Sequence, residues 1–194
     1  NTLVPPYLKP SDDYLRLGSR YVTPMDPAMH LTWYRLYVRW LFRAYFSEVI
    51  NIYEFGSGSG INLPILADMH YPASVIGLDW SESAVQIANE IGHRTGYEHV
   101  SGQPFDMLDP KGNIVAGSAV LTVGAMEQLG PDGWKPFVEW LSAQMPALVV
   151  FVEPVLEFYD TNSLFGLIGY LHHKARGYWE GFPGWLRQQE ADGK

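Results

Sequence analysis

The stretch from residue 50 to residue 60 constrains the fold of this chain more than any other. It reads Ile-Asn-Ile-Tyr-Glu-Phe-Gly-Ser-Gly-Ser-Gly, a short β-branched and aromatic run that breaks into three glycines at alternate positions. Such a run is typical of a buried strand, and the glycines predict a tight turn where the backbone approaches a ligand closely. The next apolar run, 74–80, carries Asp79 near its end. Together they predict a doubly wound α/β sheet that binds a nucleoside, with the carboxylate of Asp79 on the ribose hydroxyls.

The spacing of the glycines favours one class of cofactor over another. The dinucleotide fingerprint is G-x-G-x-x-G, in which the glycines let a pyrophosphate approach a helix N-terminus. Here the glycines follow G-x-G-x-G, and Glu54 stands two residues before the first of them. A carboxylate at this position would repel a pyrophosphate, but it suits a cofactor that carries an ammonium and a sulfonium group. The turn therefore argues against the first alternative, a nicotinamide-dependent oxidoreductase on the same kind of sheet.

Four elements in chain order resemble the motifs of class I S-adenosylmethionine-dependent methyltransferases. In order, they are the glycine turn at 54–60, the segment 77–84 (Gly-Leu-Asp-Trp-Ser-Glu-Ser-Ala), the segment 103–109 and the segment 118–129. In the last of these, many members carry Glu-His where this chain has Glu127 followed by Gln128. The resemblance covers roughly residues 50–153. It implies a methyltransferase with S-adenosylmethionine as its cofactor.

The resemblance also implies which residues hold the cofactor. They are Glu54, Gly56, Ser57, Gly58, Gly60, Asp79, Trp80, Asp106 and Met107. The glycine turn is expected to wrap the amino-acid and ribose portion, and Asp106 with Met107 to contact the adenine. Other interpretations stay open: Asp79 as a helix N-cap, Trp80 as a core side chain, and Asp106 as part of the turn that Asp109-Pro-Lys-Gly predicts.

Strand and helix patterns alternate along the middle of the chain. The expected segments are 49–55, 61–70, 74–80, 82–92, 98–105, 115–123, 133–145 and 147–153, an order that specifies a mostly parallel sheet with helices on both faces. Ser81 or Ser83 is expected to cap the helix at 82–92, with Ser83 and Gln86 forming a capping box. We therefore predict a Rossmann-like α/β fold of the class I methyltransferase kind.

Three parts make up the predicted single domain. Residues 1–48 form an N-terminal helical cap with a helix at about 27–46, for which Asp26 before Pro27 is a good N-cap. Residues 49–153 form the cofactor-binding core. Residues 154–194 form a helical tail on the acceptor side, with helices at 162–173 and 185–190. The C-terminal β-hairpin that the resemblance implies is missing from this tail.

The catalytic candidates follow from the chemistry of methyl transfer. Transfer from a sulfonium is an in-line displacement, and a hydroxyl acceptor of high pKa needs a general base or a metal. Glu127 and Glu153 both follow predicted strands, and His172 and His173 end the predicted helix at 162–173. We predict that one of Glu153, His172 and His173 acts as the base, and Glu127 is a further catalytic candidate. The alternatives are solvated carboxylates and a surface histidine pair, and no pattern of ligands indicates a metal.

The acceptor candidates are basic and aromatic. Arg35, Arg39 and Arg43 recur every four residues, which is typical of a solvated helix face but also suits a phosphate-bearing acceptor. We predict that Arg35, Lys174, Arg176 and Tyr178 bind the acceptor. The segments 127–130, 152–160 and 172–178 resemble methyltransferases of surface-polysaccharide and lipopolysaccharide assembly, which implies O-methylation of a sugar hydroxyl. An N- or C-methyl acceptor stays open, as does a non-catalytic scaffold domain of a polysaccharide-synthesis protein.

Composition excludes several other classes of function. The net charge of −8 argues against nucleic-acid binding through a basic face, and no apolar run approaches the length of a membrane span. The chain has no cysteine, so it has neither a disulfide framework nor a thiolate metal site. We therefore expect a cytoplasmic protein with a carbohydrate or other small hydroxyl acceptor. Because the hairpin is missing, an open alternative is that this chain is part of a larger multidomain glycan-assembly protein.

Overall fold

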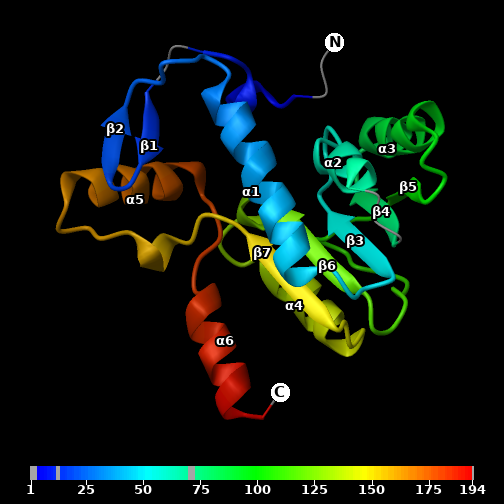
Figure 1. Cartoon of the computed structure of the whole chain (residues 1–194). Coiled ribbons are helices and arrows are strands. Elements are labelled where there is room, and N and C mark those ends of the chain that lie inside the picture. The colour runs from blue at the N-terminus through cyan, green and yellow to red at the C-terminus, as the bar shows by residue number, and fades with distance from the viewer. Residues whose placement is uncertain (1–3, 12–13, 70–72, 194) are drawn as a thin grey trace.

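A five-stranded, all-parallel sheet forms the centre of the protein in the computed structural model, which describes residues 4–11, 14–69 and 73–193 (Figure 1). The strands lie in the order β5-β4-β3-β6-β7. Their bounds are β3 (Asn51–Phe55), β4 (Ser74–Asp79), β5 (Val100–Pro104), β6 (Ala119–Val123) and β7 (Leu148–Val152). Parallel strands covered on both faces read as continuous apolar runs, and in β4 every residue after Ser74 is buried. The predicted α/β fold is confirmed.

Helices cover both faces of this sheet and enclose two apolar cores. On one face α1 (Met29–Tyr45), α2 (Asn62–Asp68) and α3 (Glu82–Thr95) pack over side chains such as Ile52 and Val75. On the other face α4 (Trp134–Ala143) and α6 (Phe182–Ala191) pack over Tyr53 and Ile76. Neighbouring residues of one strand enter opposite cores because side chains alternate along a strand. The sheet is therefore doubly wound, as the alternation of segments predicts.

The order of the strands reverses between β3 and β6. The chain passes from β3 through β4 to β5 on one side, and then returns to place β6 on the other side of β3. In open α/β sheets, ligands bind outside the carboxyl ends of the strands at such a switch point. The turns that follow β3 and β6 are consequently where a ligand is expected.

An N-terminal hairpin, which the sequence analysis did not predict, lies against a C-terminal helix (Figure 1). The 3₁₀ helix η1 (Pro6–Leu8) precedes β1 (Leu15–Leu17) and β2 (Arg20–Val22), which pair antiparallel. Tyr21 of β2 packs on Phe165 of α5 (Leu164–Arg176), with ring centroids 5.2 Å apart. The Arg16 guanidinium donates a hydrogen bond to the Phe165 carbonyl at 2.8 Å. The N-terminal hairpin and α5 therefore lie side by side, although they are far apart in the sequence.

Several predicted boundaries need correction. The first long helix starts at Met29, and Asp26 accepts a hydrogen bond from the Ala28 backbone N–H instead of capping the helix itself. The capping box of Ser83 and Gln86 is absent, because the Ser83 hydroxyl bonds that of Ser81 and Gln86 donates to Glu82. The predicted helix 61–70 ends at Asp68 as α2; residue 70 lies outside the described residues.

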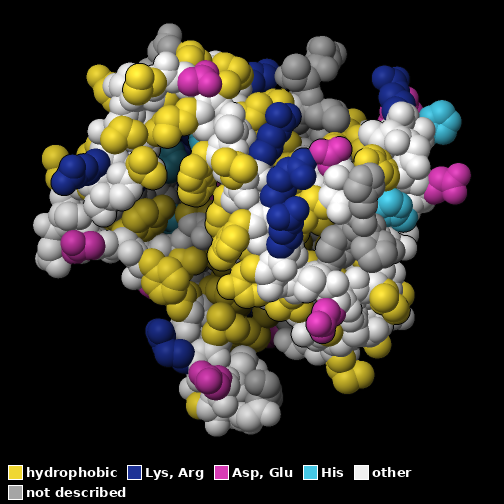
Figure 2. Space-filling view, in the orientation of Figure 1, with side chains coloured by type: hydrophobic (Ala, Val, Ile, Leu, Met, Phe, Trp, Pro, Cys, Tyr) yellow, Lys and Arg dark blue, Asp and Glu magenta, His cyan; other side chains and the backbone are white. Residues whose placement is uncertain are grey.

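The tail after β7 is helical, as predicted. It holds η3 (Leu156–Phe158), α5 and α6, and α5 extends to Arg176 because Gly177 ends it in the left-handed conformation. Within the described residues no strand follows β7, and no helix there has the length and apolar character needed to cross a bilayer. Figure 2 shows apolar side chains gathered over the hairpin, α5 and the adjoining side of α1.

Candidate active site

The glycine turn after β3 is shaped for close approach. Gly56, Gly58 and Gly60 have φ of +68°, +51° and +67°, a region that L side chains rarely adopt. A Cβ on Gly56 would lie 2.4 Å from the Cβ of Ala125, and a Cβ on Gly60 would lie 2.8 Å from a methyl of Ile91. A Cβ on Gly58 would instead face open space, with only the Gly56 carbonyl within 4 Å. Two of the glycines thus serve packing, and the third leaves room for a ligand.

Asp79 joins the end of β4 to this turn. One carboxylate oxygen accepts the Gly58 backbone N–H and the other accepts the Ser81 N–H, both at 2.9 Å. The side chain is buried, and it still lines the cavity between the two turns. A carboxylate offers about four acceptor positions. Asp79 therefore holds the glycine turn in place and keeps lone pairs for two hydroxyl donors.

A cavity of about 540 Å³ lies beside this carboxylate. It is lined by Gly56, Gly58, Asp79, Trp80, Phe105, Asp106, Met107, Leu108, Ala125, Gln128 and Leu129. Trp80 is 80% exposed at its rim, so it is not a core side chain. Asp106 accepts the Leu108 N–H at 2.8 Å, which makes it a turn residue as well as part of the lining. The volume and the mixed lining suit a ligand of nucleoside size.

Glu54 lies buried below the glycine turn with one oxygen unpaired. Oε1 accepts from the Asn62 amide at 2.6 Å, and Asn62 in turn accepts from the Tyr34 hydroxyl at 2.7 Å. Oε2 is buried and has no hydrogen-bond partner among the described residues. Burial raises the pKa of Glu54 to about 7, with a smaller contribution from Asp79, while the bond from Asn62 lowers it. A buried carboxyl oxygen without a hydrogen bond costs free energy. A hydrogen bond from a cationic donor would offset this cost more strongly than one from a neutral donor.

Glu127 and Glu153 stand together across the turn that follows β6. Glu153 accepts from the Thr122 hydroxyl at 2.7 Å, from the Ala125 N–H at 3.1 Å and from the Glu127 N–H at 3.4 Å. Its carboxylate is thus committed to the loop that carries Glu127. Glu127 lies in η2 (Met126–Leu129), and burial, followed by the charge of Glu153, raises its pKa to about 7. The two carboxyl groups thus differ in their surroundings: Glu153 is hydrogen-bonded to the loop after β6, and Glu127 lies on that loop.

Comparison with known proteins identifies the architecture. No protein-family model and no curated protein matches the chain. Among solved structures, the PH0226 protein of Pyrococcus horikoshii OT3 is similar with a TM-score of 0.53 and 15% identity, over 63% of this chain and 58% of that one. A SAM-dependent methyltransferase from Aquifex aeolicus gives a TM-score of 0.52 and 16% identity, over 63% of this chain and 66% of that one. The chain has the class I methyltransferase fold.

This fold does not by itself fix the reaction. The [4+2]-cyclase SpnF is also similar, with a TM-score of 0.51 and 12% identity, over 70% of this chain and 47% of that one. The chain spans less than two thirds of the length of each of these three proteins. One fold can carry many unrelated reactions, so the activity of this chain depends on the residues of its site.

The histidine pair at the end of α5, His172 and His173, does not line the cavity beside Asp79. His173 is buried, and its Nε2 bonds the Trp179 carbonyl at 2.8 Å, so it supports the tail instead of facing a ligand. His172 is exposed, and Lys174 pairs with Glu180 at 2.7 Å. The backbone links the segment to the site, because the Trp179 N–H donates to the Glu127 carbonyl.

The structure does not gather the predicted acceptor residues into one place. Arg35 is exposed on α1, and neighbouring Arg39 pairs with Asp68 of α2. Neither Arg35 nor Arg176 lines the cavity beside the glycine turn. Within the described residues no group of three or more His, Cys, Asp or Glu could hold a metal ion.

Three residues of the site were missed by the sequence analysis. Tyr7 lies near enough to Glu127, Glu54 and Glu153 for their charges to add to the effect of its partial burial, which raises its pKa. Burial also raises the pKa of Tyr159, with Glu127 adding to the rise and Arg16 opposing it. Asn62 orients Glu54. Only Asn62, which follows the glycine turn directly, had a local signal.

Proposed function

We propose that this protein binds S-adenosylmethionine and transfers the methyl group to a hydroxyl of a sugar in a glycan. One observation carries the cofactor: the buried, unpaired oxygen of Glu54 beneath the glycine turn, with Asp79 at the end of the next strand. An ammonium group would satisfy Glu54, and ribose hydroxyls would satisfy Asp79. A pyrophosphate would meet the carboxylate of Glu54, which disfavours a nicotinamide cofactor.

The residues around the cavity fit the remaining parts of the cofactor. Asp106 and Met107 would hold the adenine, and Trp80 would cover one of its faces. When bound, the cofactor supplies a methyl group on a positively charged sulfur. The chain's own task is then to hold the acceptor oxygen in line behind that methyl group and to take up its proton.

Glu127 is the proposed base. Its pKa of about 7 lies at neutral pH. A general base works best when its pKa is close to the pH of the reaction. Glu127 would take up the proton of the acceptor hydroxyl. Glu153 holds the loop of Glu127 through the bonds described above, and the charge of Glu127 adds to the effect of burial in raising the pKa of the Tyr7 and Tyr159 phenols.

The sugar acceptor rests on the resemblance of the segments 127–130, 152–160 and 172–178 to glycan methyltransferases. A cytoplasmic location and membership of a larger glycan-assembly protein belong to the same proposal. Calorimetric titration with S-adenosylhomocysteine, with NADH in parallel, tests the cofactor. Micromolar binding of the first compound alone supports the proposal, whereas binding of NADH alone, or of neither compound, contradicts it.

Binding of S-adenosylhomocysteine is expected to release protons near pH 7. Free Glu54, with its pKa of about 7, is partly protonated at this pH, and an ammonium beside it favours the ionised form. Calorimetry in buffers of different ionisation enthalpy measures the release. It should disappear above about pH 8.5, where Glu54 is already ionised, and in Glu54→Gln. Release of the same size in Glu54→Gln would show that another group titrates.

The turnover number is expected to rise with pH through about 7 and then to level off. The ionised form of Glu127 is the active one, so acid removes activity as the carboxylate is protonated. Glu127→Gln should lower turnover by roughly 100-fold or more and abolish this pH dependence. Glu139→Gln, on the exposed face of α4, is the matched control. An unchanged pH profile in Glu127→Gln would remove Glu127 from the mechanism.

A further inference from the structure

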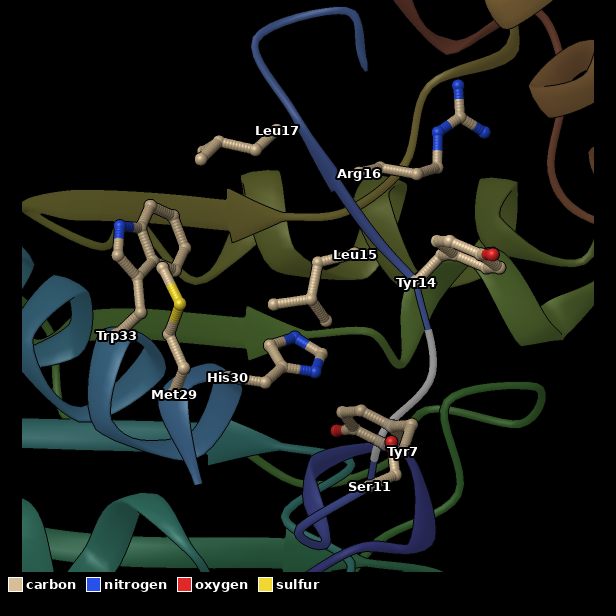
Figure 3. A pocket seen from close by; sticks show the side chains of 9 residues that line it. All are labelled: Tyr7, Ser11, Tyr14, Leu15, Arg16, Leu17, Met29, His30 and Trp33. Atoms are coloured by element: carbon tan, nitrogen blue, oxygen red, sulfur yellow. The ribbon is translucent and has the colours of Figure 1, made fainter. Parts of the chain in front are cut away.

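A second cavity, of about 500 Å³, lies between the N-terminal segment, β1 and the first turn of α1 (Figure 3). It is lined by Tyr7, Ser11, Tyr14, Leu15, Arg16, Leu17, Met29, His30 and Trp33. None of these belongs to the cofactor cavity, and none was predicted to bind the acceptor. The N-terminal hairpin and α1 thus enclose a separate binding space above the sheet.

The lining changes character from one end of this cavity to the other. Figure 3 shows Tyr7 and Ser11 at one end, His30 and Leu15 between, and Leu17 with Trp33 at the other. The first end presents hydroxyl groups and the second presents apolar surface. Trp33 is 53% exposed and Leu17 is 50% exposed, so the apolar end opens to solvent.

In Figure 3 Tyr7, at the hydroxyl end, lies beyond the arrowheads of the central strands, the edge of the sheet at which the loop of Glu127 follows β6. The carboxyl groups of Glu127, Glu54 and Glu153 all act on the Tyr7 phenol, whose pKa they help to raise. Tyr159 supports the same placement. Burial raises the pKa of its phenol, Arg16 of the cavity lining lowers it, and Glu127 adds to the rise. A molecule in this cavity would therefore present its polar end at the edge of the sheet that carries the loop of Glu127.

Among the described residues that line the cavity, Arg16 is the only one with a permanent charge. None of the described residues that line it is acidic. The Arg16 guanidinium is already engaged, since it donates to the Phe165 carbonyl and lies 3.9 Å from the centre of the Phe165 ring. In Figure 3 its side chain points away from the space that Leu15 and His30 border. Hydroxyls of a ligand would find partners in Tyr7, Ser11 and the His30 ring.

We propose that this cavity is the acceptor site, and that it selects a hydroxylated head group carried on an apolar tail. The head would lie at Tyr7 and Ser11, at the edge of the sheet that carries the loop of Glu127, and the tail would run past Leu15 and Met29 to Trp33 and Leu17. This inference rests on the proposed methyl transfer and narrows its substrate class. A sugar attached to an alkyl or isoprenoid chain has this chemistry, whereas a free sugar has only the head.

Two glucosides with the same head separate the tail from the sugar. Ligand-observed NMR titration would compare methyl glucoside with octyl glucoside, the latter below its micelle concentration, with and without saturating S-adenosylhomocysteine. Octyl glucoside is expected to bind at least about tenfold more tightly, which corresponds to burial of about two methylene groups. Equal affinities of the two glucosides would overturn the proposal.

Variants then locate the tail. Trp33→Ala and Leu17→Ala should each weaken octyl glucoside by about fivefold or more and leave S-adenosylhomocysteine binding unchanged. Trp40→Ala is the matched control, because Trp40 lies on the same helix with 56% exposure and does not line the cavity. Equal loss in Trp40→Ala, or no loss in the other two variants, contradicts the assignment. Failure of S-adenosylhomocysteine to bind would instead refute the proposed function, while the glucoside comparison would still decide the cavity.

Discussion

Replacement of Asp79 by alanine is expected to weaken S-adenosylhomocysteine binding by at least about 100-fold. A hydrogen bond to a charged group contributes about 1.5–3 kcal/mol, and two ribose hydroxyls would donate to this carboxylate. Each 1.4 kcal/mol is tenfold in affinity. The variant also removes the acceptor of the Gly58 N–H, so the glycine turn loses the bond that fixes its approach to the ligand. Titration calorimetry measures the loss.

The control for this variant is Asp132→Ala. Asp132 is an exposed carboxylate that pairs with Lys135 on α4 and contacts neither cavity. Asp132→Ala changes the net charge by the same amount as Asp79→Ala and leaves the site unaltered. Asp79→Asn keeps the size of the side chain, and it should fall between the native protein and the alanine variant. Near-native affinity in Asp79→Ala, with the fold intact by circular dichroism, would disprove the cofactor site.

The core of the fold was predictable because its signals are local. Each strand from β3 to β7 lies within one short segment, and the predicted ranges contain all five, including β5, whose sequence Val-Ser-Gly-Gln-Pro is mostly polar. The N-terminal hairpin was missed although it carried a signal. Its strands are three residues long, and Gly18 and Ser19 both have positive φ, the conformation of a two-residue hairpin turn. A Gly-Ser pair between two short runs predicts this hairpin, but the preceding prolines favoured irregular structure.

The site was predictable only in part, for a related reason. Asp79 and the glycine turn belong to consecutive strands, and their approach follows from the parallel pairing of β3 with β4. The electrostatic effect of Glu127 on Tyr7 arises only from the packing of segments far apart in the sequence, which no spacing encodes. Glu153 has the position expected of a base, at the end of β7, but its hydrogen bonds hold the β6 loop. Sequence position identified the edge of the sheet, and hydrogen bonding distinguished the roles there.

Replacement of Gly56 by alanine is expected to destabilise the whole domain by about 3 kcal/mol. A non-glycine residue in the left-handed region costs about 1–2 kcal/mol, and Gly56 has φ of +68°. Its new Cβ would also stand 2.4 Å from the Cβ of Ala125, and overpacking of this kind costs about 1–3 kcal/mol. For a chain of this size the loss lowers the melting temperature by about 6–12 °C. Thermal unfolding followed by circular dichroism measures it.

Substitutions of two other glycines distinguish the cost of backbone strain from the effect of contact with the ligand. Gly18→Ala, at φ of +54° with nothing within 4 Å, adds only the strain, so it should cost about 1–2 kcal/mol and leave cofactor binding unchanged. Gly58→Ala adds a similar strain, but its methyl group points into the cofactor cavity. It should therefore fold as well as Gly18→Ala and bind S-adenosylhomocysteine at least about tenfold more weakly, the equivalent of one lost hydrogen bond. If Gly58→Ala bound normally, the ligand would not approach the turn at its middle glycine, and the site would have to lie elsewhere along the sheet edge.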